Sequence, residues 1–139
     1  MIPDLPANID DIKGFLAQDE AEALYEHALA SSSRGAVLEI GSYCGKSTIY
    51  LGLACRQKNA TVFALDHHRG SEEHQLGEYF HDPDLYDDGE GLVDTFKEFR
   101  RNISSAGLNE TVVPLVAGSE AAARQWQTPL AMVFIDGGH

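Results

Sequence analysis

The chain has 139 residues, of which 43% are hydrophobic and 23% are charged, a balance typical of one globular domain with a real core. Its net charge of −12 argues against a nucleic-acid or anionic-membrane surface, which needs clustered Lys and Arg. Residues 1–15 carry acids and no apolar run. The sequence therefore predicts neither a signal peptide nor a transmembrane span, and we expect a cytoplasmic protein in which Cys44 and Cys55 are free thiols.

Helical and extended patterns alternate along the chain. Apolar residues at helical spacing predict helices, and short apolar runs predict strands. In chain order, the sequence predicts a helix over 19–29, a strand over 36–41, a helix over 47–56, a strand over 61–65, a helix over 95–106, a strand over 111–118, a helix over 120–126 and a strand over 131–136. Pro114 cannot donate to a strand ladder, so its strand is predicted at a sheet edge. Strands separated by helices predict an α/β fold with a parallel, Rossmann-like sheet.

Residues 69–91 interrupt this alternation. The segment is rich in Gly, acids, His and Tyr and has weak periodicity. A loop of this length in a compact domain is usually a functional lid or a disordered insertion. Tyr79, Phe80 and Tyr86 give it something to pack, which favours the lid. Residues 1–30 are expected to form an N-terminal helical segment of the same single domain.

The sequence GSYCGKST, residues 41–48, resembles a phosphate-binding loop but has one residue too few. The phosphate loop requires four residues between its glycines, and only three separate Gly41 from Gly45. Two residues before Gly41 is Glu39, at the end of the first predicted strand. A carboxylate that points into the crevice there would repel phosphate and would favour a ligand with an ammonium group. Lys46 is then expected to be a solvated side chain at the rim of the loop.

The second predicted strand is followed by Asp66, and an acid in this position can accept hydrogen bonds from both hydroxyls of a ribose. Ser47 begins the helix after the loop, and the free N–H groups at that end suit a carboxylate. Gly41 and Gly45 are expected to let the backbone approach the ligand closely. A ligand with a ribose, an amine and a carboxylate, and with no required phosphate, fits S-adenosylmethionine.

Four motifs extend this interpretation to the end of the chain. They are VLEIGSYCGKST, VFALD, VAGS and MVFIDGGH, in this order. Over about residues 14–139 the sequence resembles the class I S-adenosylmethionine-dependent methyltransferases, and within them the catechol O-methyltransferase group and related bacterial small-molecule O-methyltransferases. The resemblance implies strands one to four of a seven-stranded methyltransferase fold. It also implies O-methylation of a small-molecule acceptor, without nucleic-acid or membrane partners, and it leaves a homodimer open.

The resemblance implies a role for individual residues of these motifs. Asp66 would bind the ribose. The methionine end would be lined by the loop and the helix start, namely Glu39, Gly41, Ser42, Tyr43, Gly45 and Ser47. The adenine would be bordered by His67, Gly118 and Ser119. His68, directly before the insertion, is assigned to an acceptor-side lid. A separate multi-histidine metal site is disfavoured, because the spacing of the histidines fits no structural zinc pattern.

The last motif supplies the residues expected at the reacting centre. Asp136 matches the family's acid that faces this centre and that, in the metal-dependent members, ligates a divalent cation such as Mg²⁺. Three residues later the catechol-type enzymes have a lysine base, and this chain has His139. A histidine can remove the acceptor's proton, because its pKa lies near neutrality. The alternative for His139 is a terminal residue without a partner.

The chain stops directly after the fourth predicted strand, so we expect a fragment of a longer protein or a partner that covers the open strand. Three other functions remain open. A nicotinamide-dependent dehydrogenase also needs an acid after the second strand, but it needs G-x-G-x-x-G in the loop. A nucleotide hydrolase needs the missing loop residue. A non-catalytic cofactor-binding or interaction module would share every feature described.

Overall fold

The computed structural model describes residues 2–69, 86–87 and 92–136. Its main sheet has four strands in the order β5-β2-β1-β6. The strands are β1 (Ala36–Ile40), β2 (Val62–Asp66), β5 (Val112–Val116) and β6 (Leu130–Ile135). Every pair in it is parallel, which confirms the predicted α/β fold. The strand that contains Pro114 lies at an edge, as the missing N–H donor predicted.

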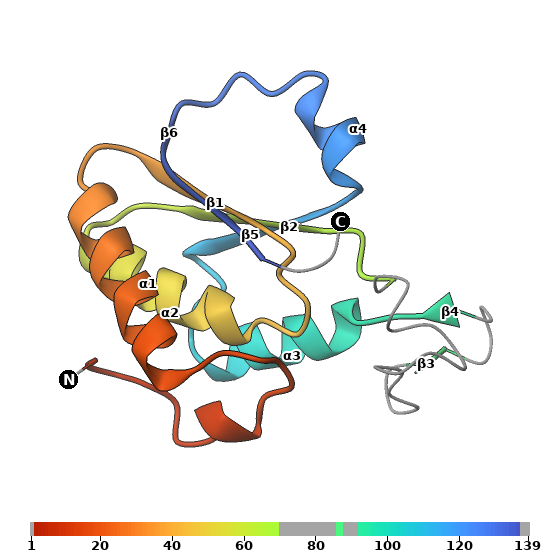
Figure 1. Ribbon diagram of the computed structural model, residues 1–139, viewed down its shortest axis with the longest axis horizontal. Helices are drawn as coiled ribbons and strands as arrows, with labels where there is room; N and C mark the ends of the chain where they lie inside the picture. Colours follow the sequence, from red (N-terminus) through yellow and green to blue (C-terminus); the bar gives the residue numbers. More distant parts are fainter. Residues whose placement is uncertain (1, 70–85, 88–91, 137–139) are drawn as a thin grey trace.

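Helices cover the two faces of this sheet unequally. Figure 1 shows three long helices on one side and the short helix α4 on the other. The three are α1 (Gln18–Ser31), α2 (Lys46–Gln57) and α3 (Phe96–Ser105), preceded by the 3₁₀ turn η1 (Ile9–Asp11). Their bounds lie within two residues of the predicted ones. Residues 1–30 were expected to be a helical segment. In the described residues before α1, only η1 is helical.

Helix α4 (Ser119–Ala123) ends earlier than the predicted helix over 120–126. The cause is Trp126, whose apolar ring made the helical pattern look longer. Its indole N–H donates to the carbonyl oxygen of Thr128 at 2.8 Å. Its ring meets Phe63 edge to face, with centroids 5.3 Å apart. The chain therefore leaves the helix so that the indole can pack on the sheet.

Two further strands, one in the insertion and one directly after it, were not predicted. β3 (Tyr86–Asp87) and β4 (Leu92–Val93) form an antiparallel pair. Strands of two residues are too short to show a periodic pattern, so they could not be predicted from the sequence. Residues 70–85 and 88–91 lie outside the described part of the chain, so the lid expected over 69–91 stays a prediction.

The main core lies between the sheet and helices α1, α2 and α3. Val37, Val62 and Val112 are paired across β1, β2 and β5, and all three are buried on this side. The stripe predicted for the second helix is also buried there: Ile49, Tyr50, Leu53 and Ala54. Both cysteines are buried thiols, as predicted. The periodicity of 3.6 thus identified the buried face of the helix correctly.

The chain order of the strands creates a switch point between β1 and β6. From β1 the chain proceeds outward to β2 and β5, and it then returns to place β6 on the other side of β1. The segments that follow the strands meet at one edge, because Gly41 N–H donates to Leu65 O and Asp136 N–H donates to Ile40 O, both at 2.8 Å. In open parallel sheets, ligands bind beyond this edge at the switch point.

Candidate functional site

The loop after β1 turns sharply and needs its two glycines for reasons internal to the protein. Gly41 has φ 94°, and a Cβ atom added to it would lie 1.7 Å from the carbonyl oxygen of Asp136. This is the point where the segments after β1 and β6 touch. Gly45 also has φ 94°, and an added Cβ would lie 3.2 Å from the Phe99 ring. The sequence interpretation, that both glycines serve the approach of a ligand, therefore missed the contacts that the protein itself imposes.

Glu39 lies beneath this loop and is fully buried. One of its carboxylate oxygens accepts a hydrogen bond from the Ser47 hydroxyl and the other from the Thr48 hydroxyl, both on the first turn of α2. Burial raises the pKa of Glu39 from 4.5 to about 7; the two hydroxyls lower it, and the negative charges of Asp136 and Asp66 raise it further.

The structure thus places Glu39 against α2 rather than on an open surface of the crevice. Its direct contact with a ligand amine stays a prediction, as does the contact of the Ser47 hydroxyl with a ligand. Thr48 was not among the predicted site residues. The signal for it was available, since two neighbouring hydroxyls on the first turn of a helix can both reach a carboxylate at the end of the preceding strand.

Asp66, at the end of β2, has its carboxylate held at both oxygens. Oδ2 accepts the backbone N–H of Tyr43 at 2.7 Å, and Oδ1 accepts the backbone N–H of His68 at 2.9 Å. Since each carboxylate oxygen has two lone pairs, Asp66 keeps acceptor capacity for a diol. The side chain is half-buried, so one side remains open to solvent. The arrangement is that of a fixed, partly open acceptor.

Tyr43 and Ser42 complete the loop between the glycines. Tyr43 has φ 50°, an unusual value for a residue other than glycine, and its backbone N–H donates to Asp66. Ser42 is buried, and its hydroxyl makes no hydrogen bond. Lys46 is half-buried rather than fully solvated, and its Cβ lies 3.5 Å from where a Cβ on Gly14 would be.

The two histidines after Asp66 have opposite environments. His67 is exposed, and its Nδ1 accepts the backbone N–H of Arg69 at 3.0 Å, which leaves the ring accessible for the predicted adenine contact. His68 is only 1% exposed, and burial lowers the pKa of its ring. The ring packs against Phe96 and Phe99 of α3. The assignment of His68 to an acceptor-side lid is therefore wrong, because an apolar pocket in the domain body holds it.

The predicted residues after β5 and β6 reach the same edge. Gly118 and Ser119 are exposed at the start of α4, and Ala117 N–H just before them donates to Asp66 O at 3.2 Å. Asp136 is half-buried, and its backbone N–H is bonded to the end of β1. His139 lies outside the described residues. The described site residues predicted from sequence thus lie at the same edge of the sheet. Glu39 is buried beneath the glycine loop, against the first turn of α2.

A divalent cation would need several ligands beside Asp136. Across residues 2–69, 86–87 and 92–136, no group of three or more His, Cys, Asp and Glu side chains could hold a metal ion. The described residues therefore do not form a cation site by themselves. The Asp136 carboxylate acts electrostatically on Glu39.

A strand order with a switch point, a glycine loop after β1 and an acid at the end of β2 are typical of the cofactor-binding half of a Rossmann-like fold. Comparison with known families agrees. A family model described as a methyltransferase domain matches residues 38–139. The chain belongs to this methyltransferase-domain family.

Solved structures show the same fold. Cofactor-bound Rv0187 from MTB is 22% identical with a TM-score of 0.63, and the match covers 94% of this chain and 50% of that one. An O-methyltransferase from Bacillus cereus in complex with SAH is 20% identical with a TM-score of 0.61, covering 92% and 49%. TomG from Streptomyces achromogenes, an O-methyltransferase of tomaymycin synthesis in complex with SAM, is 16% identical with a TM-score of 0.58, covering 88% and 45%. The chain spans about half the length of these proteins.

Proposed function

We propose that this chain is the S-adenosylmethionine-binding part of a methyltransferase that acts on a hydroxyl group of a small-molecule acceptor. The observation that carries the proposal is the geometry of Asp66. Its carboxylate is fixed by two backbone N–H groups at 2.7 and 2.9 Å, beside the glycine loop at the switch point of the sheet. A fixed acceptor with spare lone pairs suits the two hydroxyls of a ribose. Membership of the methyltransferase-domain family and the cofactor-bound neighbours support the same ligand.

Charge also supports this ligand over a nucleotide. The acids at the end of β2 and directly after β6 are Asp66 and Asp136, and each acts electrostatically on the buried Glu39. S-Adenosylmethionine has a sulfonium and an ammonium group, both of which such a field favours, whereas a di- or triphosphate would be repelled. The methionine carboxylate can be met by the first N–H groups of α2, which have no acceptor within the helix. The net charge of −12 likewise favours a small acceptor over nucleic acid.

In the proposed reaction, the acceptor oxygen attacks the methyl carbon in line with the sulfur. A carbon–oxygen bond forms as the carbon–sulfur bond breaks, and the sulfur leaves as a neutral thioether. The acceptor's proton passes to a base, for which we propose His139. The protein's contribution is then mainly positioning, to which proton removal adds roughly 10²–10⁴-fold.

The assay that tests this function uses the natural full-length protein with methyl-labelled S-adenosylmethionine and a panel of hydroxylated aromatic acceptors. We expect label in a methyl ether for at least one acceptor. His139→Ala should lower the rate by roughly 10²–10⁴-fold, leave cofactor affinity unchanged and remove the limb of the pH profile near neutrality. Label on nitrogen or carbon alone would contradict O-methylation.

A metal at Asp136 is a separate part of the proposal. If the complete protein binds Mg²⁺ there, a chelator should abolish transfer and added Mg²⁺ should restore it. Activity that survives chelation would leave Asp136 as a positioning acid of a metal-independent enzyme.

Location and assembly belong to the same proposal. In the described part of the chain, no helix has the length and apolarity needed to span a membrane. We propose a cytoplasmic location from the sequence, which leaves a homodimer open, and light scattering of the natural protein would decide between monomer and dimer.

A further inference from the structure

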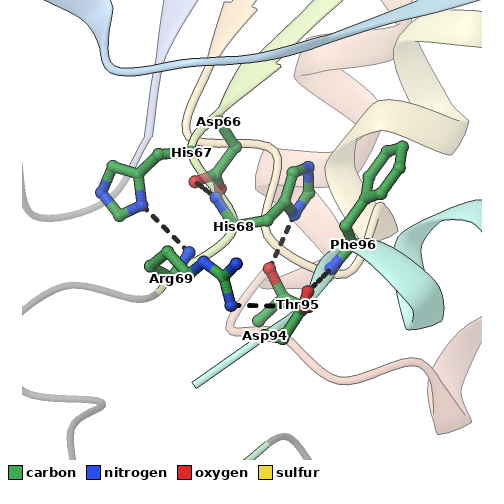
Figure 2. Close-up of polar contacts among 7 residues, drawn as sticks. All are labelled: Asp66, His67, His68, Arg69, Asp94, Thr95 and Phe96. Carbon is green, nitrogen blue, oxygen red and sulfur yellow. Dashed lines mark hydrogen bonds and ion pairs between the residues drawn. The ribbon is translucent and has the colours of Figure 1, made fainter. Parts of the chain in front are cut away.

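The residues on either side of the insertion form a stem, which we define as His68, Arg69, Asp94 and Thr95. The backbone N–H of Thr95 donates to His68 O at 2.9 Å, and the Thr95 hydroxyl is 2.7 Å from His68 Nδ1. Arg69 and Asp94 add an ion pair at 3.6 Å. Figure 2 shows the His68–Thr95 side-chain contact and the Arg69–Asp94 ion pair beside Asp66. Residues 27 positions apart are thereby held together at the edge of the sheet.

His68 has a strained backbone that something must stabilise. Its φ is 63°, in the left-handed region, which costs about 1 kcal/mol or more for a residue with a side chain. The backbone N–H of His68 donates to Asp66 Oδ1 at 2.9 Å, which closes a local turn at the end of β2. The interactions that hold it come from the stem and from α3, where the Phe96 and Phe99 rings lie 5.2 and 5.1 Å from the imidazole.

The buried imidazole is held through one of its two nitrogens. Nδ1 contacts the Thr95 hydroxyl, while Nε2 is buried and makes no hydrogen bond to any described residue. Thr95 is 1% exposed, so water cannot substitute for its hydroxyl at low cost. The Thr95–His68 hydrogen bond is therefore the one polar contact in the described structure that fixes the orientation of the ring.

We propose that His68 is a positioning residue for Asp66, and that the hydrogen bond between the Thr95 hydroxyl and His68 Nδ1 holds His68 in the conformation that orients the ribose-binding carboxylate. The inference rests on the proposed function, because it gives the stem a role in cofactor binding. The chain enters and leaves the insertion through the stem, and the stem contains the residue that orients Asp66. A change in the stem therefore changes affinity for the ribose.

Two variants of Thr95 separate the effect of its hydroxyl from the effect of its shape. Thr95→Val keeps the shape and removes the hydroxyl, whereas Thr95→Ser keeps the hydroxyl. Calorimetric titration with S-adenosylhomocysteine should show roughly 10-fold weaker binding for Thr95→Val and a change within about 3-fold for Thr95→Ser. Thr111→Val is the control, because Thr111 is also buried but lies before β5, at the opposite edge of the sheet. It should leave the affinity unchanged.

A double-mutant cycle separates positioning from a general loss of structure. In an Asp66→Asn background, Thr95→Val should cost less than about 2-fold, because the carboxylate that it orients is gone. The 2′-deoxy analogue of S-adenosylhomocysteine should likewise lose most of the difference between wild type and Thr95→Val. An equal 10-fold loss in both backgrounds, or equal binding by Thr95→Val and Thr95→Ser, would overturn the proposal.

Amide hydrogen exchange tests the positioning without a ligand. Thr95→Val should speed exchange of the His68 amide by roughly 10-fold relative to Thr95→Ser, because that amide is bonded to Asp66. If the exchange result holds and the wild type does not bind S-adenosylhomocysteine, the proposed function fails and the positioning role of His68 stands. If the wild type binds and the exchange rates are equal, the positioning role fails and the function stands.

Discussion

Glu39 is a carboxylic acid that lies entirely out of contact with solvent. It is fully buried, and its pKa is raised to about 7 mainly by that burial. The folded state therefore binds more protons than the unfolded state between pH 4.5 and about 7, so the stability of the protein should fall as pH rises through this window. The loss amounts to about 3 kcal/mol once the group is fully ionised.

Glu39→Gln should remove this dependence, since an amide does not titrate. Urea unfolding at pH 5 and pH 8 should show that the wild type loses about 2–3 kcal/mol more than the variant over this interval. His68, whose pKa burial lowers, contributes the opposite slope below pH 6.5 in both proteins and cancels in the comparison. Parallel pH profiles for the two proteins would show that Glu39 is ionised in the native state at both pH values.

Gly41 and Gly118 form a matched pair for a test of backbone constraint. Gly41→Ala should destabilise the protein by at least about 2 kcal/mol, because φ is 94° and the new Cβ would meet the Asp136 carbonyl oxygen at 1.7 Å. Gly118→Ala should change stability by less than about 0.5 kcal/mol, since φ is −70° and nothing lies within 4 Å. Urea unfolding of both variants checks this, and equal effects would contradict the close contact between the two loops.

Asp66 and Lys46 distinguish a ribose site from a phosphate loop. Asp66→Ala should weaken binding of S-adenosylhomocysteine by about 1–3 kcal/mol, the range for loss of a hydrogen bond to a charged group. Lys46→Ala should change it by less than about 0.5 kcal/mol, because the side chain has no role in the proposed site. Isothermal titration measures both. A larger loss for Lys46→Ala would indicate that the loop binds phosphate.

At the scale of the elements, the sequence predicted each main helix and strand because local pattern decides them. The helix over 47–56 was readable from residues such as Ile49 and Leu53, which repeat at helical spacing and are buried. The end of α4 was not readable, since Trp126 satisfies the helical pattern and yet packs on Phe63 of the sheet. Non-local packing overrode local propensity at that position.

The stem shows the same limit for the candidate site. Asp66 and Gly41 were predicted because the position after a strand and the spacing of glycines are local features. The contact between His68 and Thr95 joins residues 27 positions apart, across an insertion with weak periodicity. No pattern along the chain could report it, and His68 was therefore assigned to the wrong environment.

At the scale of the whole molecule, the second face of the sheet is apolar and largely open. Leu38, Phe63, Val113 and Val133 lie in register across it. On the outer strands Val113 is 41%, Val133 48% and Ile135 60% exposed, and among the described helices only the short α4 lies on this side, as Figure 1 shows. Exposed apolar strands at a sheet edge favour self-association.

The 139-residue chain should therefore bind an apolar fluorescent dye and self-associate. Lysines in place of Val133 and Ile135 should reduce both effects, with a change in stability of less than about 1 kcal/mol. Lysines in place of Ala121 and Ala123, which are exposed on α4, add the same charge elsewhere and should leave dye binding unchanged. Equal effects of the two pairs would mean that net charge, and not the apolar face, governs association.

The choice of ligand tests the account as a whole. Calorimetric titration of the natural full-length protein with S-adenosylhomocysteine, ATP and NAD compares the three ligands that the loop and Asp66 could serve. We expect saturable binding of S-adenosylhomocysteine and no measurable heat with ATP or NAD, because the loop lacks a phosphate site and the acids at the strand ends repel phosphates. Tighter binding of ATP or NAD than of S-adenosylhomocysteine would contradict it.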